Sequence, residues 1–115
     1  MSTTHPPAHR RLAIYGTLAP GGLHHDELDG MAGTWWRGVI LGRYFAAVEG
    51  EQEGYPGVIL DEAGERIEVH VFDSPDLPHH WARLDEFEGP GYRRVVTAVR
   101  TEAGLFEATI YELDF

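Results

Sequence analysis

The sequence predicts an α+β domain built on a curled sheet or small barrel of about six strands, with one main helix beside it. Short apolar segments of strand length recur along the chain, one segment alone has a clear helical period, and Gly- or Pro-containing turns separate the strand segments. This pattern is typical of antiparallel sheets that curl on themselves. With 115 residues, the chain is long enough for one hydrophobic core and too short for two.

Six segments have the length and apolar content of β-strands. They are Leu12–Tyr15, Thr34–Phe45, Val58–Leu60, Ile67–Val71, Tyr92–Arg100 and Leu105–Leu113. The last two flank the turn Thr101–Gly104 and are therefore predicted to form a hairpin. Gly38 and Gly42 lie inside the second segment and predict bulges or tight bends, as at the corners of barrels. The segment Leu23–Leu28 is predicted to form a short flanking helix.

Composition limits the classes of function. The formal net charge of −10 disfavours binding to nucleic acid or to an anionic membrane, so small molecules and proteins are the expected partners. The absence of cysteine excludes disulfides, thiolate zinc sites and cysteine nucleophiles. Residues 1–10 are expected to form a flexible polar tail before a domain of residues 11–115. No segment has the apolar length of a signal sequence or a membrane helix, so a cytoplasmic location is expected, while the oligomeric state is left open.

The most informative segment is the helix predicted over Pro78–Glu88. At 100° per residue, four side chains fall within about 60° of one another, and they are Leu77, Trp81, Leu84 and Glu88. Glu88 thus shares an apolar stripe, just before the helix-ending Gly89. Burial and the negative end of the helix dipole both raise the pKa of a carboxyl group in that place. Glu88 is therefore predicted to transfer protons near neutral pH; the alternative is that the helix frays and leaves it exposed.

A glycine-containing loop follows the first strand. It consists of Tyr15, Gly16, Thr17 and Leu18, followed by Ala19-Pro20-Gly21-Gly22. Glycine lets a ligand approach the backbone, so successive N–H groups of this loop are predicted to bind an anionic group. The loop lacks the Gly-Lys-Ser/Thr of a phosphate-binding P-loop and the three-glycine fingerprint of dinucleotide sites. An ordinary turn is the alternative.

Four short segments follow one another along the chain in the order Tyr15–Leu18, Tyr55–Gly57, Leu84–Gly89 and Tyr92–Arg94. Together they resemble the gamma-glutamyl cyclotransferase-like family, and the similarity runs from about Leu12 to Leu113. No single segment is highly specific, but the ordered set is. The resemblance implies a small mixed β-barrel of about six strands with one main helix and short flanking helices, in agreement with the pattern of elements.

The resemblance also implies an enzyme without metal or organic cofactor that acts on a small gamma-glutamyl compound. Backbone amides of Tyr15–Leu18 would hold the γ-glutamyl group, and Glu88 would be the catalytic acid/base. The implied reaction is intramolecular aminolysis of a γ-glutamyl amide to 5-oxoproline and a free amine or amino acid. Ala19-Pro20 departs from the family, which often carries a basic residue there, so the leaving group could differ. The alternative is a non-catalytic domain of the same fold that binds a small acidic ligand or a protein.

Two tyrosines are further candidates for the pocket. Tyr92 follows Glu88 closely enough to fold back over it, and Tyr111 lies on the closing strand of the same hairpin. For each, the alternative is a ring packed in the core with its hydroxyl at the surface. No metal site is predicted, because the adjacent residues of His24-His25 and of His79-His80 point their side chains in different directions.

Overall fold

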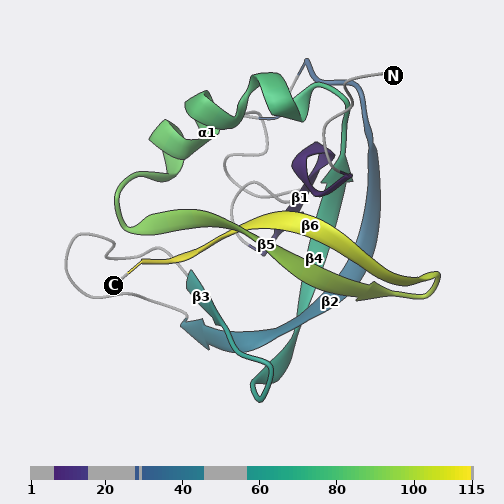
Figure 1. Ribbon diagram of the computed structural model, residues 1–115, viewed down its shortest axis with the longest axis vertical. Helices are drawn as coiled ribbons and strands as arrows, with labels where there is room; N and C mark the ends of the chain where they lie inside the picture. The colour runs from purple at the N-terminus through teal and green to yellow at the C-terminus, as the bar shows by residue number, and fades with distance from the viewer. Residues whose placement is uncertain (1–6, 16–27, 29, 46–56, 115) are drawn as a thin grey trace.

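The computed structural model describes residues 7–15, 28, 30–45 and 57–114. In chain order the elements are η1 (Pro7–Arg10), β1 (Arg11–Ile14), β2 (Thr34–Phe45), β3 (Gly57–Leu60), β4 (Glu65–Asp73), η3 (Leu77–His79), α1 (Trp81–Glu88), β5 (Tyr92–Thr101) and β6 (Gly104–Leu113). Figure 1 shows the strands curled into a barrel, with α1 lying outside it and above the start of β5. The predicted α+β class, with about six strands and one main helix, is confirmed. Among the described helices, none is long and apolar enough to span a membrane.

One sheet forms the barrel. Its strand order is β3-β2-β4-β1-β6-β5, and a further pairing between Val39 of β2 and Arg100 of β5 closes five strands into a ring. β3 stays outside this ring and pairs with the end of β2. β1 and β6 run parallel, with Leu12 opposite Thr109, whereas the other neighbouring strands are antiparallel. The barrel is therefore mixed, as predicted.

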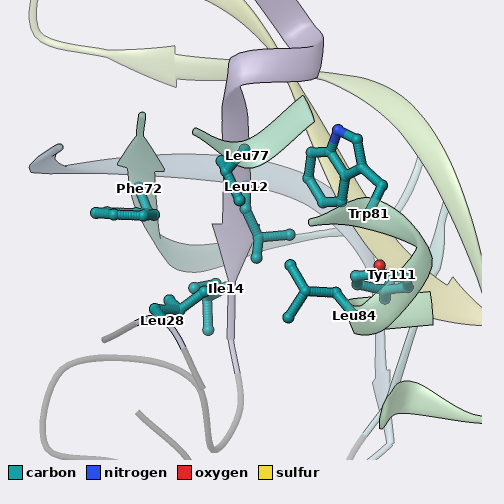
Figure 2. Packing of buried hydrophobic residues seen from close by; sticks show 8 residues of the cluster. All are labelled: Leu12, Ile14, Leu28, Phe72, Leu77, Trp81, Leu84 and Tyr111. Carbon is teal, nitrogen blue, oxygen red and sulfur yellow. The ribbon is translucent and has the colours of Figure 1, made fainter. Parts of the chain in front are cut away.

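The hydrophobic core has two layers, one inside the barrel and one between the barrel and the helices. The inner layer draws on the five strands of the ring and is completed by Val58 of β3; it contains Ala13, Ile40, Val58, Val69, Val71, Val99, Ala108 and Ile110. The outer layer, shown in Figure 2, contains Leu12, Ile14, Leu28, Phe72, Leu77, Trp81, Leu84 and Tyr111. Alternate residues of a strand face opposite sides, so in β1 Ala13 packs inside while Leu12 and Ile14 meet the helix. The predicted helix stripe therefore packs on the outside of the barrel.

Two glycines of β2 allow strands to approach closely. A Cβ atom on Gly38 would lie 2.3 Å from Cγ1 of Val99, at the point where β2 meets β5. A Cβ atom on Gly42 would lie 2.6 Å from the carbonyl oxygen of Ile59 in β3. Of the bulges or tight bends predicted at these positions, a bulge is wrong, since β2 pairs with β4 without a break from Thr34 to Gly42. The glycines instead leave the space that barrel closure and the β2–β3 pairing require.

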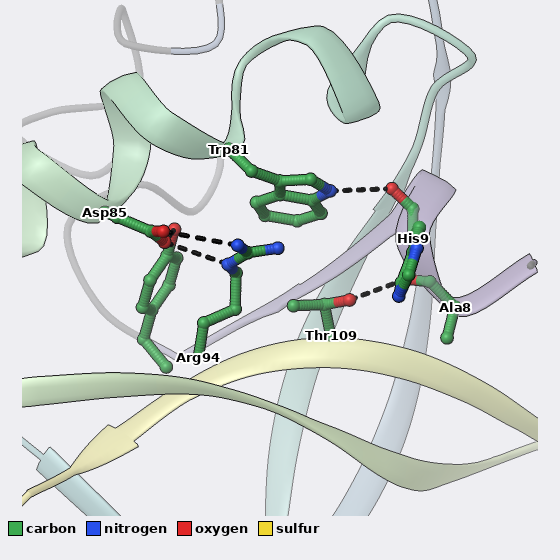
Figure 3. A network of polar contacts seen from close by, with 7 residues as sticks. Ala8, His9, Trp81, Asp85, Arg94 and Thr109 are labelled. Carbon is green, nitrogen blue, oxygen red and sulfur yellow. Dashed lines mark hydrogen bonds and ion pairs between the residues drawn. The ribbon is translucent and has the colours of Figure 1, made fainter. Parts of the chain in front are cut away.

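Residues 7–10, which the sequence placed in the tail, are attached to the barrel as η1. Ala8 is buried, and its carbonyl oxygen accepts a hydrogen bond of 2.7 Å from the Thr109 hydroxyl of β6. The carbonyl oxygen of His9 accepts one of 3.0 Å from Nε1 of Trp81 in α1 (Figure 3). Residues 1–6 of the predicted tail lie outside the described residues. η1 therefore links the helix to the barrel.

Candidate active site

Helix α1 presents Glu88 on the side that faces the barrel. The helix begins at Trp81, later than predicted, and η3 precedes it as a separate 3-10 turn. Trp81 and Leu84 are buried in the outer core layer, and Glu88, one turn further along the same stripe, is half-buried. The helix ends at Gly89, whose φ of 84° favours glycine and whose N–H bonds to the carbonyl oxygen of Asp85 at 3.1 Å. The predicted end of the helix is confirmed.

The electrostatic setting of the Glu88 carboxyl suits proton transfer near neutral pH. Burial raises its pKa from 4.5 to about 7, so its charged and neutral forms are both populated at neutral pH. The last turn of α1 contains no basic residue, and the helix dipole there also favours the neutral form. A group with this pKa can accept a proton in one step of a reaction and return it in the next.

Two phenol groups lie close to Glu88. Burial raises the pKa of Tyr15, and the neighbouring Tyr92 and Glu88 raise it further. Burial also raises the pKa of Tyr111, with further contributions from Asp85 and, to a smaller extent, Glu88. The Tyr15 hydroxyl donates a hydrogen bond of 2.6 Å to the carbonyl oxygen of Tyr111. These electrostatic interactions place Glu88 near Tyr15, which follows β1, and near Tyr111 in the last part of β6.

Tyr92 begins β5, directly beyond the end of the helix. Its backbone N–H donates a 3.3 Å hydrogen bond to the carbonyl oxygen of Gly89, and its ring packs against the outer core layer. The structure thus gathers four of the residues singled out from the sequence, namely Glu88, Tyr15, Tyr92 and Tyr111. The other three, Gly16, Thr17 and Leu18, lie outside the described residues.

Asp85, which is not among the candidate site residues from the sequence, is hydrogen-bonded to Tyr111. Asp85 accepts two hydrogen bonds from Arg94, 2.9 Å from Nε to Oδ1 and 3.2 Å from Nη2 to Oδ2 (Figure 3). Its Oδ1 also accepts a hydrogen bond of 2.6 Å from the Tyr111 hydroxyl. No local pattern could have indicated the Asp85–Arg94 contact, because the two residues meet only after the chain turns at Gly89.

A second carboxylate, Glu112, is buried next to Tyr111. Its Oε1 accepts a hydrogen bond of 2.9 Å from Nε of Arg93 and forms an ion pair with Nη2 of the same residue at 2.8 Å. Its Oε2 accepts a hydrogen bond of 3.0 Å from the backbone N–H of Leu60. Glu112 therefore joins β6 to both β5 and β3. A sequence signal for this pair existed, since the predicted turn at Thr101–Gly104 sets Arg93 opposite Glu112 in the hairpin.

Histidine does not assemble with carboxylates into a metal site in the part of the chain that the structure describes. No group of three His, Asp or Glu side chains there has a metal-binding arrangement. His79 ends η3 and His80 follows it, just before α1. His24-His25 lies outside the described residues.

A shallow groove with a volume of about 730 Å³ lies elsewhere on the barrel surface. Its lining includes Leu41, Val96, Arg100 and Leu105, from β2, β5 and β6. None of the candidate residues from the sequence lines this groove. We place the candidate active site at Glu88 instead, because the raised pKa and the neighbouring phenols occur together there.

The chain matches the sequence model of the family described as gamma-glutamyl cyclotransferase, AIG2-like, over residues 12–114. This span contains Glu88 and the three tyrosines beside it. Among curated proteins, none matches the chain.

Solved structures share the fold. YkqA from Bacillus subtilis is 30% identical with a TM-score of 0.71, over 92% of this chain and 36% of YkqA. An AIG2-like protein from Mus musculus is 18% identical with a TM-score of 0.68, over 90% of this chain and 76% of that protein. A protein named gamma-glutamyl cyclotransferase is 16% identical with a TM-score of 0.63, over 90% of this chain and 66% of that protein. The chain spans about a third of YkqA, and the other two similarities show the fold alone.

Proposed function

Because the chain belongs to the gamma-glutamyl cyclotransferase, AIG2-like family, we propose that it is an enzyme that cyclises a γ-glutamyl amide. The products are 5-oxoproline and a free amine or amino acid. The observation that supports this most directly is the half-buried Glu88 carboxyl, whose pKa burial raises to about 7 and which lies beside Tyr15 and Tyr111. A carboxyl group poised in this way is suited to move one proton between two nitrogen atoms.

Glu88 acts first as a base. Its carboxylate removes a proton from the α-ammonium group of the substrate, and the freed amine attacks the γ-carbonyl carbon. The new C–N bond closes a five-membered ring and leaves an oxyanion on a tetrahedral carbon. Glu88 then donates its proton to the leaving nitrogen, the original amide C–N bond breaks, and the ring nitrogen releases its extra proton to water. Because nucleophile and electrophile belong to one molecule, a folded γ-glutamyl arm supplies the proximity.

The remaining candidate residues bind the substrate in this proposal. Backbone N–H groups of Tyr15–Leu18 hold the γ-glutamyl group and stabilise the oxyanion, while Tyr92 and Tyr111 border the pocket. The reaction uses no metal and no organic cofactor, and it takes place in the cytoplasm without nucleic acid or membrane as a partner. A chelator added to the assay tests whether the reaction needs a metal, and cell fractionation tests the cytoplasmic location.

A panel of γ-glutamyl amines and γ-glutamyl dipeptides, assayed for 5-oxoproline, tests the proposed reaction. Turnover of at least one compound, unaffected by chelator, is the expected result. If none is turned over while calorimetry shows that the protein binds γ-glutamyl ligands, a non-catalytic binding domain replaces the enzyme.

The pH dependence of kcat/KM is expected to follow the ionisation of Glu88. Protonated Glu88 cannot accept a proton, so kcat/KM should fall as the pH drops below about 7, by about tenfold per pH unit on the acidic side. Rates measured between about pH 5 and about pH 9 locate this limb. An acidic limb centred near 4.5, the usual value for glutamate, would show that the group responsible is not in a buried setting.

A further inference from the structure

Asp85 joins α1 to both strands of the β5–β6 hairpin. Its carboxylate accepts hydrogen bonds from the Tyr111 hydroxyl at 2.6 Å and from Arg94 at 2.9 and 3.2 Å. Arg94 and Tyr111 lie directly opposite each other in the hairpin, on β5 and β6. One carboxylate of the helix therefore holds a side chain from each strand.

Trp81, one turn before Asp85 in the helix, contacts the same two residues of the hairpin, Arg94 and Tyr111. Cζ of Arg94 lies 4.9 Å from the centroid of the Trp81 ring, and the Trp81 and Tyr111 rings meet edge to face at 6.4 Å. Figure 3 shows Arg94 reaching Asp85 beneath the Trp81 ring. Trp81 and Asp85 are four positions apart and so occupy one side of the helix. Arg94 therefore contacts two helix side chains at once, which fixes the rotation of the helix about its axis.

The last turn of α1 depends on these contacts. The helix has eight residues, which is too few for stability without tertiary contacts. Leu84 and Asp85 face the barrel at the start of the last turn, and Glu88 closes that turn before Gly89. The direction in which the Glu88 carboxyl points therefore follows from how this turn is held.

We propose that Asp85 is a positioning residue for Glu88. It fixes the last turn of α1 on β5 and β6, so that the Glu88 carboxyl stays in its half-buried place beside Tyr15 and Tyr111. The catalytic consequence rests on the proposed role of Glu88 as the acid/base. Asp85 carries no proton in the reaction, because Arg94 and Tyr111 engage its carboxylate as an acceptor.

Loosening this attachment is expected to change the ionisation of Glu88. Two phenol groups interact electrostatically with Glu88, Tyr15 just after β1 and Tyr111 on β6, and Tyr92 of β5 interacts with Tyr15. The Asp85–Arg94 pair holds the helix that carries Glu88. Burial is what raises the pKa of Glu88 to about 7. A helix turn that moves away from the barrel admits water, which lowers this pKa toward 4.5.

Three variants test the proposal. Asp85→Asn removes the charge that pairs with Arg94, and Tyr111→Phe removes only the hydroxyl that bonds to Asp85. Glu86→Gln is the matched control, because it removes an equal charge from an exposed position of the same helix. The pKa of Glu88 is measured in each folded protein by NMR titration of its side-chain carboxyl carbon. Values of kcat and KM are measured with a γ-glutamyl substrate, and circular dichroism verifies folding.

Asp85→Asn and Tyr111→Phe are expected to lower the pKa of Glu88 by about one unit and kcat by about 10- to 100-fold, with a smaller change in KM. Glu86→Gln should leave both close to their wild-type values. An unchanged pKa of Glu88 in the two folded variants would overturn the proposal, and if Asp85→Asn does not fold, Tyr111→Phe decides alone. If the wild-type protein produces no 5-oxoproline but the pKa of Glu88 still falls in the variants, the positioning role stands and the proposed reaction is rejected.

Discussion

Replacing Glu88 with glutamine is expected to lower kcat for a γ-glutamyl amide by about 10²- to 10⁴-fold. Glutamine keeps the shape and the hydrogen-bonding capacity of glutamate, but it cannot carry a proton from the α-ammonium group to the leaving nitrogen. Initial rates of 5-oxoproline formation measure the loss, and calorimetry measures substrate binding, which should persist in a weakened form. A variant with wild-type turnover would remove Glu88 from the mechanism.

The same substitution is expected to stabilise the fold at alkaline pH. The pKa of Glu88 is about 7 in the folded protein against a usual value of 4.5, so the folded state binds this proton more tightly than the unfolded state. The resulting contribution to stability is fully present below pH 4.5 and is lost as the pH rises through about 7. At about pH 8, Glu88→Gln should therefore raise the free energy of unfolding by on the order of 1–3 kcal/mol, and near pH 4 the gain should vanish. Denaturant unfolding at the two pH values is the measurement, and a less stable variant at the higher pH contradicts the expectation.

Truncating Leu84 to alanine is expected to lower the free energy of unfolding by about 2–5 kcal/mol. Leu84 is 0% exposed, between α1 and the barrel, so its loss leaves a cavity in the outer core layer. Because total stability is only about 5–15 kcal/mol, this is a large fraction of it.

Leu105→Ala is the matched control for Leu84→Ala, since it makes the same truncation at a side chain that is 62% exposed on the hairpin. It should change stability by less than about 1 kcal/mol. Urea unfolding of both variants gives the comparison. Equal costs at the two positions would mean that the helix does not depend on the barrel for its packing.

The sequence predicted those parts of the fold that local periodicity determines. Alternation at Ile67, Val69 and Val71 indicated β4, and the spacing of Trp81, Leu84 and Glu88 indicated the face of α1 that packs on the barrel. The order of the strands was not predictable in the same way. It depends on which apolar faces meet after folding, and the parallel pairing of β1 with β6 has no sign in either segment alone.

The candidate site, like the fold, has parts that local sequence predicts and parts that it does not. Glu88 could be predicted because its apolar stripe lies within one helix. Burial of that stripe then raises the pKa of Glu88. The Arg93–Glu112 pair could have been found, because a turn at Thr101–Gly104 determines the whole register of the hairpin. The hydrogen bonds of Asp85 could not be predicted, because its partners come from two other elements whose positions the helix sequence does not encode.

The parallel pairing of β1 with β6 also determines when the site can exist. Leu12 lies opposite Thr109, and the hydroxyl of Tyr15 bonds to the backbone of Tyr111, 96 positions later. A chain growing on the ribosome can pair both β2 and β1 with β4 before β6 is synthesised, but the pairing of β1 with β6 must wait for β6. Bringing Tyr15 and Tyr111 together closes a long loop, and the loss of chain entropy comes before the stabilising contacts form. Contacts between residues this far apart in sequence therefore slow folding. Because Tyr111 lies on β6, a chain that has not yet paired β6 with β1 lacks the assembled site.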